Sequence, residues 1–412
     1  MQIDYISYID LPGSSFNGHD LQIELNSRGH ISYQFVMEQQ GDNPNTICVA
    51  PTPEYFMLHE YCREFEEATS LHALIYPFGK KIMISDEFIT TDIVHCHLIH
   101  NGIISLYDLE EMSKIKPVVW TLHDPWAFTG HCVHPIDCDQ WQTGCKKCQY
   151  LDRHFPLKKD NSALLWNIKK KVYTSIDVDI VVASQWMKRL VEDSPLTSHF
   201  KNVHLIPFGI NIDVFSENLN RQSIREQLGI PNESFVLFFR PQPSFFKGLD
   251  TILGMLDILQ PTKPVVLLTV GYGEFPLAYK KMYKTIELGW VNNDRRMADL
   301  YCACDVFLMP SIAESFGLMA IEAMASGRPI VVMEGTALPD VTFAPDCGIC
   351  ISKNNAVAEL KEVVERLMLD PDECRTRGKK GRELAEKHYR FEDYVNKHIQ
   401  LYEEILKRKG KA

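Results

Sequence analysis

Short apolar runs, bounded by polar or glycine-containing turns, recur along the whole chain. They lie at residues 1–7, 92–97, 118–124, 180–184, 235–239, 265–270, 286–291, 305–309 and 330–332. Runs this short, most of them apolar throughout, are typical of strands in a parallel sheet. Helix-length segments lie between several of them, as crossover connections require. The pattern therefore predicts an α/β protein.

The most informative unit begins at Pro310, where the run at 305–309 ends. Residues 316–326 are mostly helix formers, Gly327 is placed to end that helix, and Pro329 stops it from continuing. A further apolar strand follows at once. The order is strand, turn, helix and strand, which is one α/β unit.

The start of this helix predicts an anion site. Its first turn is expected to present the backbone amides of Ser315, Phe316, Gly317 and Leu318. Such amides lack partners within the helix and can bind a phosphate. Glu314 lies beside them, and Glu322 lies two turns further on, which at helical rise is roughly 12 Å. Carboxylates accept hydrogen bonds from sugar hydroxyls, so one could lie at each end of a bound diphosphate. A plain crossover helix with solvated glutamates is the alternative.

Composition narrows the classes of function. The 412 residues are enough for two domains, each with its own core. No run of about twenty apolar residues could span a membrane, and the first residues do not resemble a signal peptide. The net charge of −11 argues against nucleic acid as a partner. Twelve cysteines without such a leader indicate a reducing, cytoplasmic compartment, where thiols or metal ligands are favoured over disulfides.

The segment around Glu314 resembles the donor-site motif of the family 4 retaining glycosyltransferases, in particular those of bacterial polysaccharide assembly. The matching positions are Pro310, Ser311, Glu314, Ser315, Phe316, Gly317, Glu322, Ala323 and Gly327. The resemblance covers nearly the whole chain and implies a GT-B fold, in which two Rossmann-like parallel-sheet domains face a cleft. The expected limits are 1–208 for an acceptor-side domain, 209–390 for a nucleotide-sugar domain, and 391–412 for a terminal helix that packs back toward the first domain.

The same resemblance implies which residues meet the donor phosphates. Arg240 follows the strand at 235–239, and Lys247 precedes a glycine that opens the next helix, as in the family pattern. Two fixed cations would stabilise the charge that grows on a departing nucleoside diphosphate. Gly13 lies where the family has a Gly-Gly loop near the donor, although this chain has no such pair. Phe239 replaces the glycine that usually precedes the arginine.

On the sugar side, the resemblance assigns His123, at the end of the strand at 118–124, to the donor sugar. Asp124 could orient that histidine or contact the acceptor. Glu314 would hold the sugar as well, and Glu322 would bind the ribose. The catalytic group is thus expected to comprise His123, Arg240, Lys247 and Glu314.

The implied reaction moves a hexose-type sugar from a UDP- or GDP-linked donor to a hydroxyl of a glycan, glycolipid or lipid-linked acceptor, with retained configuration. No side chain is placed as a covalent nucleophile, so same-face attack is expected, and the chemistry should require no metal or other cofactor. Two alternatives stay open. One is a nucleotide-sugar 2-epimerase on the same fold, and the other is a non-catalytic partner subunit.

A cysteine-rich loop at 129–148 lies in the first domain. It contains Cys132, Cys138, Cys145 and Cys148. These are the ligand types of a closed tetrahedral zinc site, and a long polar loop needs some such constraint to be ordered. A structural zinc ion is one interpretation, with His131 or His134 as a substitute for Cys132. Free thiols and redox pairing are the others.

An amphipathic, basic segment follows at residues 164–173, preceded by Lys158 and Lys159. It could make a peripheral contact with the anionic inner face of a membrane. A solvated helix face is the simpler interpretation.

Overall fold

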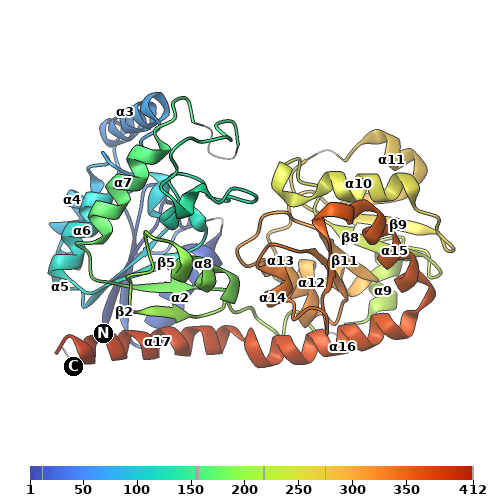
Figure 1. Ribbon diagram of the computed structural model, residues 1–412. Helices are drawn as coiled ribbons and strands as arrows, with labels where there is room; N and C mark the ends of the chain where they lie inside the picture. Colours follow the sequence, from blue (N-terminus) through green and yellow to red (C-terminus); the bar gives the residue numbers. More distant parts are fainter. Residues whose placement is uncertain (12, 154–156, 217–218, 274, 411–412) are drawn as a thin grey trace. The chain divides into compact units, whose positions relative to one another are not determined.

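The computed structural model describes residues 1–11, 13–153, 157–216, 219–273 and 275–410 (Figure 1). The chain divides into two compact units. The first comprises Met1–Ile206 and Val395–Ala412, and the second comprises Pro207–Tyr394. The limits expected from the sequence, 208 and 390, are near these positions without coinciding with them.

The first unit is built on a seven-stranded sheet in the order β3-β2-β1-β4-β5-β6-β7, in which every neighbouring pair is parallel. Its strands are β1 (Gln2–Ile6), β2 (Ile31–Val36), β3 (Thr46–Cys48), β4 (Ile93–His97), β5 (Val118–Leu122), β6 (Val178–Val182) and β7 (Val203–Leu205). Its longer helices are α2 (His19–Ser27), α3 (Pro53–Thr69), α6 (Leu106–Ile115), α7 (Ser162–Tyr173) and α8 (Gln185–Asp193).

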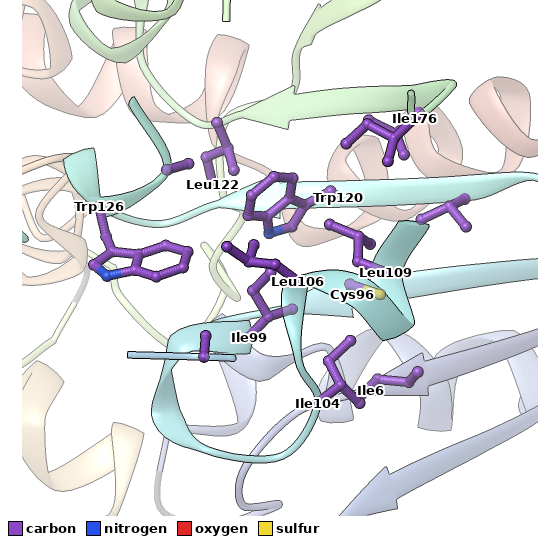
Figure 2. Close-up of a cluster of buried hydrophobic side chains, with 14 of the residues drawn as sticks. Ile6, Cys96, Ile99, Ile104, Leu106, Leu109, Trp120, Leu122, Trp126 and Ile176 are labelled. Carbon is purple, nitrogen blue, oxygen red and sulfur yellow. The ribbon is translucent and has the colours of Figure 1, made fainter. Parts of the chain in front are cut away.

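Helices cover both faces of this sheet because alternate strand residues point to opposite sides. On one face, Trp120 of β5 packs in an apolar cluster with Leu106 and Leu109 of α6 (Figure 2). On the other face, the hydroxyl of Tyr402 lies 2.9 Å from that of Tyr5 and 2.7 Å from Nδ1 of His95. Tyr402 belongs to α17 (Phe391–Arg408), so the end of the chain is part of the first unit.

The second unit contains a six-stranded parallel sheet in the order β10-β9-β8-β11-β12-β13. Its strands are β8 (Phe235–Phe239), β9 (Val265–Thr269), β10 (Lys284–Glu287), β11 (Val306–Met309), β12 (Ile330–Met333) and β13 (Ile349–Ile351). Its longer helices are α9 (Arg221–Gln227), α10 (Leu249–Ile258), α12 (Asp294–Ala303), α13 (Leu318–Ala325), α15 (Ala356–Leu369) and α16 (Pro371–His388).

Residues of β8 show how this sheet is covered. Leu237 packs with α10 and α15 on one face, whereas Phe238 packs edge-on against Tyr301 of α12 on the other. Two parallel sheets, each with helices on both faces, confirm the prediction of two Rossmann-like α/β domains.

Candidate active site

In an open parallel sheet, ligand-binding residues gather beyond the carboxyl ends of the strands. In the second unit, Arg240 directly follows β8, and Lys247 ends a short 3-10 turn before α10. Glu314 lies in the turn that leaves β11. The central strands β8 and β11 are neighbours, so these three residues share one edge of the sheet.

Lys247 and Glu314 form an ion pair, with 2.8 Å between Nζ and Oε2. Their side chains are 34% and 18% exposed, so ligand-sized groups can reach the lysine. Gly248 makes this placement possible. Its φ is +70°, and a Cβ there would collide with the carbonyl oxygen of Pro310. The glycine therefore lets the loop that carries Lys247 lie directly against the end of β11.

Arg240 lies at the same edge. Its guanidinium carbon is 5.1 Å from the ring centre of Trp290, and its Nε makes no hydrogen bond to any residue in the described part of the chain. Burial lowers the pKa of Arg240, and the nearby Glu314 opposes that shift. Arg240 is therefore a desolvated cation with donor capacity to spare, as an anion site requires.

Trp290 stacks on Tyr272, with ring centres 4.9 Å apart and planes 7° from parallel. The two rings are 41% and 69% exposed. A flat, accessible aromatic pair beside a cation is suited to stacking on a nucleobase. The apolar run at 286–291, which contains Trp290, was recognised in the sequence. The stacking of Trp290 on Tyr272 was not, because it depends on how the fold brings their two turns together.

The helix after Glu314 begins later than predicted. The expected start at Phe316 was wrong, since α13 spans Leu318–Ala325. Gly317 is the reason: with φ +96° it adopts a left-handed conformation at the N-cap, and a Cβ there would lie 2.6 Å from Leu338. Ser315 and Phe316 are therefore loop residues, and Leu318 is the first residue of the helix.

Glu322 lies on α13 and accepts a 2.8 Å hydrogen bond from the hydroxyl of Tyr301. Burial raises the pKa of Glu322 to about 7. Tyr301, also buried, interacts electrostatically with Arg240 as well. Tyr301 thus links Glu322 with Arg240. The sequence of α12 around Tyr301 did not indicate this role.

In the first unit, His123 directly follows β5. Its Nε2 lies 2.9 Å from Nδ1 of His97, and the two rings stack with centres 5.2 Å apart. Burial lowers the pKa of His123 to about 4. The imidazole is therefore neutral at pH 7 and suited to hydrogen bonding with an uncharged hydroxyl group.

Asp124 acts on His123 electrostatically, since its charge raises the pKa of that histidine against the effect of burial. Its carboxylate lies 3.2 Å from Nε2 of His100 and accepts a hydrogen bond from the amide of Trp126. Burial opposes ionisation, but His100 outweighs it and holds the pKa of Asp124 at about 2. Asp124 is a permanent anion that fixes the turn after His123.

Gly13 lies at the N-cap of the short helix α1 (Ser14–Asn17), with φ +95° and open space where a Cβ would be. Gly18 is more constrained, since a Cβ there would be 2.6 Å from Tyr5 and 2.9 Å from His97. The ring of Phe16 meets His123 edge-on at 6.3 Å. The Gly13 loop therefore shares the sheet edge of His123, while close packing requires Gly18.

The four cysteines of the 129–148 loop are near enough to influence one another electrostatically. Burial raises the pKa of Cys132 to about 12 and that of Cys145 to about 11. Over the ranges that the structure describes, no group of three or more histidine, cysteine or acidic residues is arranged to hold a metal ion. The side chains as placed do not form a zinc shell, and zinc stays a prediction for direct measurement.

The basic segment at 164–173 forms α7, but its cations do not all face solvent. Lys169 is fully buried and donates hydrogen bonds to the carbonyl oxygens of Trp126 and Thr129. It also lies over the indole ring of Trp126. Within the described ranges, no helix is long and apolar enough to cross a membrane.

Comparison with known proteins covers both units. The model described as Glycosyltransferase Family 4 matches residues 19–214, and the model described as Glycosyl transferases group 1 matches residues 220–384. A D-inositol 3-phosphate glycosyltransferase of Xylanimonas cellulosilytica is 28% identical over 221 residues, which are 50% of this chain and 52% of that protein. The chain thus spans about half the length of the first curated relatives it matches.

Solved structures resemble the whole chain. Sucrose-phosphate synthase from Thermosynechococcus elongatus superposes with a TM-score of 0.70 at 19% identity, covering 99% of this chain and 100% of that one. The HepE protein of Anabaena in complex with UDP-glucose gives 0.64 at 16% identity, with coverage of 99% and 100%. Identities this low show the fold alone. The two family models and the two parallel-sheet units together show that the chain belongs to the family 4 glycosyltransferases, with the GT-B fold.

Proposed function

We propose that this protein is a retaining hexosyltransferase that moves a sugar from a nucleotide-diphosphate donor to a hydroxyl of a glycan or lipid-linked acceptor, in surface polysaccharide synthesis. The observation that carries the proposal is the group formed by Arg240, Lys247 and Glu314 at one sheet edge. This group contains two cations and one carboxylate, and Nζ of Lys247 lies 2.8 Å from Oε2 of Glu314.

The donor diphosphate would replace Glu314 as the partner of Lys247. Arg240 would then bind the same diphosphate through its guanidinium group. As the bond between the anomeric carbon and the phosphate oxygen breaks, negative charge grows on the departing diphosphate, and both cations stabilise it. Glu314, released from Lys247, becomes free to accept hydrogen bonds from the sugar hydroxyls.

In the proposed step, the acceptor oxygen bonds to the anomeric carbon on the face that the diphosphate leaves. The acceptor proton passes to a phosphate oxygen of the leaving group. Configuration is retained, atoms and charge balance, and neither a covalent nucleophile nor a metal ion takes part. His123, neutral because its pKa is about 4, is assigned by the family resemblance to the donor sugar.

The ribose and then the base would follow the diphosphate on the side away from the transferred sugar. Glu322 is assigned to the ribose, and the Tyr272–Trp290 stack, next to Arg240, is assigned to the base. Since HepE was crystallised with UDP-glucose, uridine nucleotides are the first to test, followed by guanosine nucleotides.

Contact with a membrane surface, where a lipid-linked acceptor would lie, is proposed for apolar side chains of the first unit. The helix α3 exposes Tyr55, Phe56, Met57, Leu58, Tyr61 and Phe65. The burial of Lys169 makes the basic face of α7 a weaker candidate than the sequence indicated.

The test is a thermal-shift screen of UDP, GDP and their hexose conjugates, followed by product analysis with and without a lipid-linked acceptor. A ligand that binds only the native state raises Tm, so one nucleotide series should stabilise the protein. Glycosylated acceptor with retained configuration would support the proposal. A donor epimerised without acceptor would identify an epimerase instead, and failure of every donor to release sugar would favour a non-catalytic subunit.

A further inference from the structure

A cavity lies at the amino ends of the strands in the second unit's sheet. Its volume is about 810 Å³. Ser234, Pro264, Asp305 and Pro329 line it, and each directly precedes a strand: β8, β9, β11 and β12. The cavity is therefore at the amino ends of the strands, whereas Arg240 and Glu314 lie beyond the carboxyl ends. The two sites are separated by the length of the sheet.

The walls of this cavity carry an excess of positive charge. The cations are Arg221, Arg225, Lys263, Arg328, Arg375 and Lys379. Glu233 and Asp305 are the carboxylates among the lining residues. Arg375 pairs with Asp372 outside the lining, which leaves five cations against Glu233 and Asp305. The cavity is therefore positive, although the chain as a whole has a net charge of −11.

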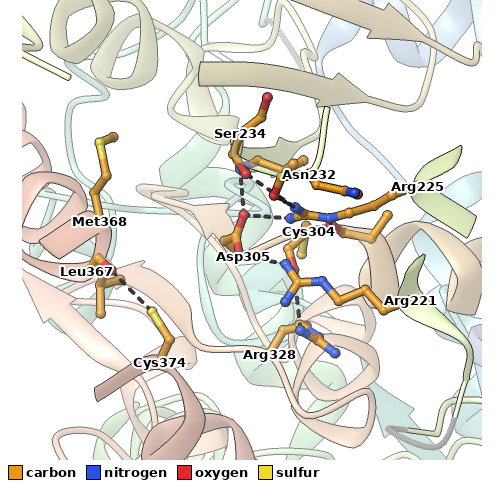
Figure 3. Close-up of polar contacts among 12 residues, drawn as sticks. Arg221, Arg225, Asn232, Ser234, Cys304, Asp305, Arg328, Leu367, Met368 and Cys374 are labelled. Atoms are coloured by element: carbon orange, nitrogen blue, oxygen red, sulfur yellow. Dashed lines mark hydrogen bonds and ion pairs between the residues drawn. The ribbon is translucent and has the colours of Figure 1, made fainter. Parts of the chain in front are cut away.

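Asp305, whose side chain is 20% exposed, does not balance the arginines around it. Asp305 pairs with Arg221 at 2.5 Å and with Arg225 at 2.7 Å (Figure 3). It also accepts a hydrogen bond from the amide of Val236. Two guanidinium groups thus share a single negative charge. This network ties α9 to β11 and holds the arginines in fixed positions.

Arg328 has no carboxylate partner in the described part of the chain. Its guanidinium donates to the carbonyl oxygens of Ser326 at 3.2 Å and Cys304 at 3.4 Å. Burial lowers the pKa of Arg328, and the positive charge of Arg221 lowers it further. A half-buried cation that lies close to another cation and lacks an ion-pair partner of its own would be stabilised by a bound anion.

Two lysines complete the set. Lys263 donates to the carbonyl oxygen of Met368 at 2.9 Å, and Lys379 projects from the exposed side of α16. Neither forms an ion pair with any residue that the structure describes. In addition, Nε of Arg221 and Oγ of Ser234 are buried without hydrogen-bond partners in those ranges. Donors therefore surround the cavity in excess of the acceptors available.

We propose that this cavity binds a phosphate-bearing small molecule at a site separate from the donor site. Guanidinium and ammonium groups together are the usual ligands of phosphate, with arginine supplying paired donors and lysine a point charge. The volume falls within the roughly 300–1,000 Å³ typical of small-molecule sites. Arg328 and Lys379 would contact the phosphate directly, and Asp305 would keep Arg221 and Arg225 in place. The assignment does not depend on glycosyl transfer.

The experiment measures binding of inorganic pyrophosphate to the full chain by calorimetry, with potassium chloride of equal ionic strength as the reference. Lys379→Gln removes an exposed lining cation and should leave the fold intact, and Arg328→Gln removes the half-buried one. Lys380→Gln is the matched control, because Lys380 lies on the same helix, pairs with Glu383 and does not line the cavity. Lys247→Ala reports on the donor site.

We expect wild-type protein and Lys380→Gln to bind equally, and Lys379→Gln and Arg328→Gln to bind roughly tenfold or more weakly, as loss of one charged hydrogen bond implies. In Lys247→Ala, pyrophosphate should still bind to the cavity. Binding lost only in Lys247→Ala would place the anion at the donor site and overturn the proposal. Equal weakening by Lys380→Gln, or no binding beyond the chloride reference, would overturn it too. If Arg328→Gln does not fold, Lys379→Gln alone decides.

Discussion

At the scale of single residues, the ion pair between Lys247 and Glu314 makes two candidate residues depend on each other. Removing Glu314 both deletes a hydrogen-bond acceptor and leaves Lys247 uncompensated. Removing Lys247 leaves a half-buried carboxylate where the donor phosphates are proposed to lie. Effects of the two substitutions should therefore not add.

Lys247→Ala and Arg240→Ala should each lower kcat by roughly 10²–10³-fold, because each cation is proposed to meet charge that develops in the transition state. Initial rates with saturating donor test this, with circular dichroism melts to verify the fold. Lys361→Ala is the control, since it removes a lysine of the same unit that pairs with Glu365 within α15. Near-normal rates in both variants would mean that these cations do not bind the diphosphate.

Glu322 predicts a pH dependence. Burial raises its pKa from an ordinary 4.5 to about 7, so the folded chain keeps a proton that the unfolded chain has lost. The free energy of unfolding should fall as pH rises from about 4.5 to about 7, by on the order of 3 kcal/mol at 1.4 kcal/mol per pKa unit. Urea denaturation of wild type and Glu322→Gln across this window tests the sign. A variant that follows the wild-type curve would assign the dependence to another group.

The same titration should appear in ligand binding. Affinity for the free nucleoside diphosphate should increase as Glu322 ionises, because a carboxylate accepts ribose hydroxyls better than a carboxylic acid does. Glu322→Gln should bind more weakly and with little pH dependence. Glu314→Gln should bind the diphosphate nearly normally but transfer sugar poorly. Equal losses of binding in both variants would show that the two ends of the donor are misassigned.

At the scale of elements, the loop that carries Lys247 depends on a glycine. Gly248→Ala meets both a positive φ and the carbonyl oxygen of Pro310, so we expect a loss of about 2–4 kcal/mol in stability and a displaced Lys247. Gly229→Ala is a matched control, because Gly229 has φ +66° but open space around its Cβ position. It should cost about 1 kcal/mol and leave activity unchanged. Equal effects of the two substitutions would show that the close approach to Pro310 is unimportant.

The cysteine loop allows a direct measurement. If the four thiols bind a structural zinc, protein purified without added metal or chelating resin should contain about one zinc per chain, and acid should release it as the thiolates regain protons. Cys138→Ser and Cys148→Ser should remove the metal, while Cys48→Ser, a free cysteine outside the loop, should retain it. Zinc-free protein in which all four loop thiols titrate would identify them as free thiols.

At the scale of the whole molecule, the chain leaves the first unit at Ile206 and returns to it at Val395. The returning segment is held by polar contacts as well as apolar ones. The Tyr402 hydroxyl lies within hydrogen-bond distance of both Tyr5 and His95. The first unit therefore requires both ends of the sequence, and its stability should respond to changes near the carboxyl terminus.

Tyr402→Phe should destabilise the first unit by about 1–3 kcal/mol, because it leaves the buried polar atoms of Tyr5 and His95 with a partner removed. Chemical denaturation, followed by hydrogen exchange to assign the affected strands, measures this. Tyr279→Phe, in the second unit, serves as the control. Faster exchange in β1 and β4 is expected, and unchanged exchange there would contradict the assigned role of Tyr402.

The order of strands and helices could be predicted from the sequence because it depends on local patterning. An apolar run of strand length is buried wherever its sheet forms, so the α/β class followed from the spacing of these runs. Two domains were expected from the chain length and the family resemblance. The Lys247-Gly248 pair and the Glu314–Gly317 turn are also local, since a positive φ favours glycine whatever lies nearby. Features of this kind need only the order of residues along the chain.

Only the tertiary structure decided which residues meet. Tyr301 donates a hydrogen bond to Glu322, Asp124 pairs with His100, and the buried Lys169 lies over the indole ring of Trp126. In each case, the residues next to these side chains in the sequence give no indication of the contact. The positive cavity is the strongest case, because it forms where separate strands begin side by side. Its charged residues are far apart in the sequence and come together only because parallel strands begin at the same edge of the sheet. Which strands are neighbours depends on the strand order, and the apolar pattern does not specify that order.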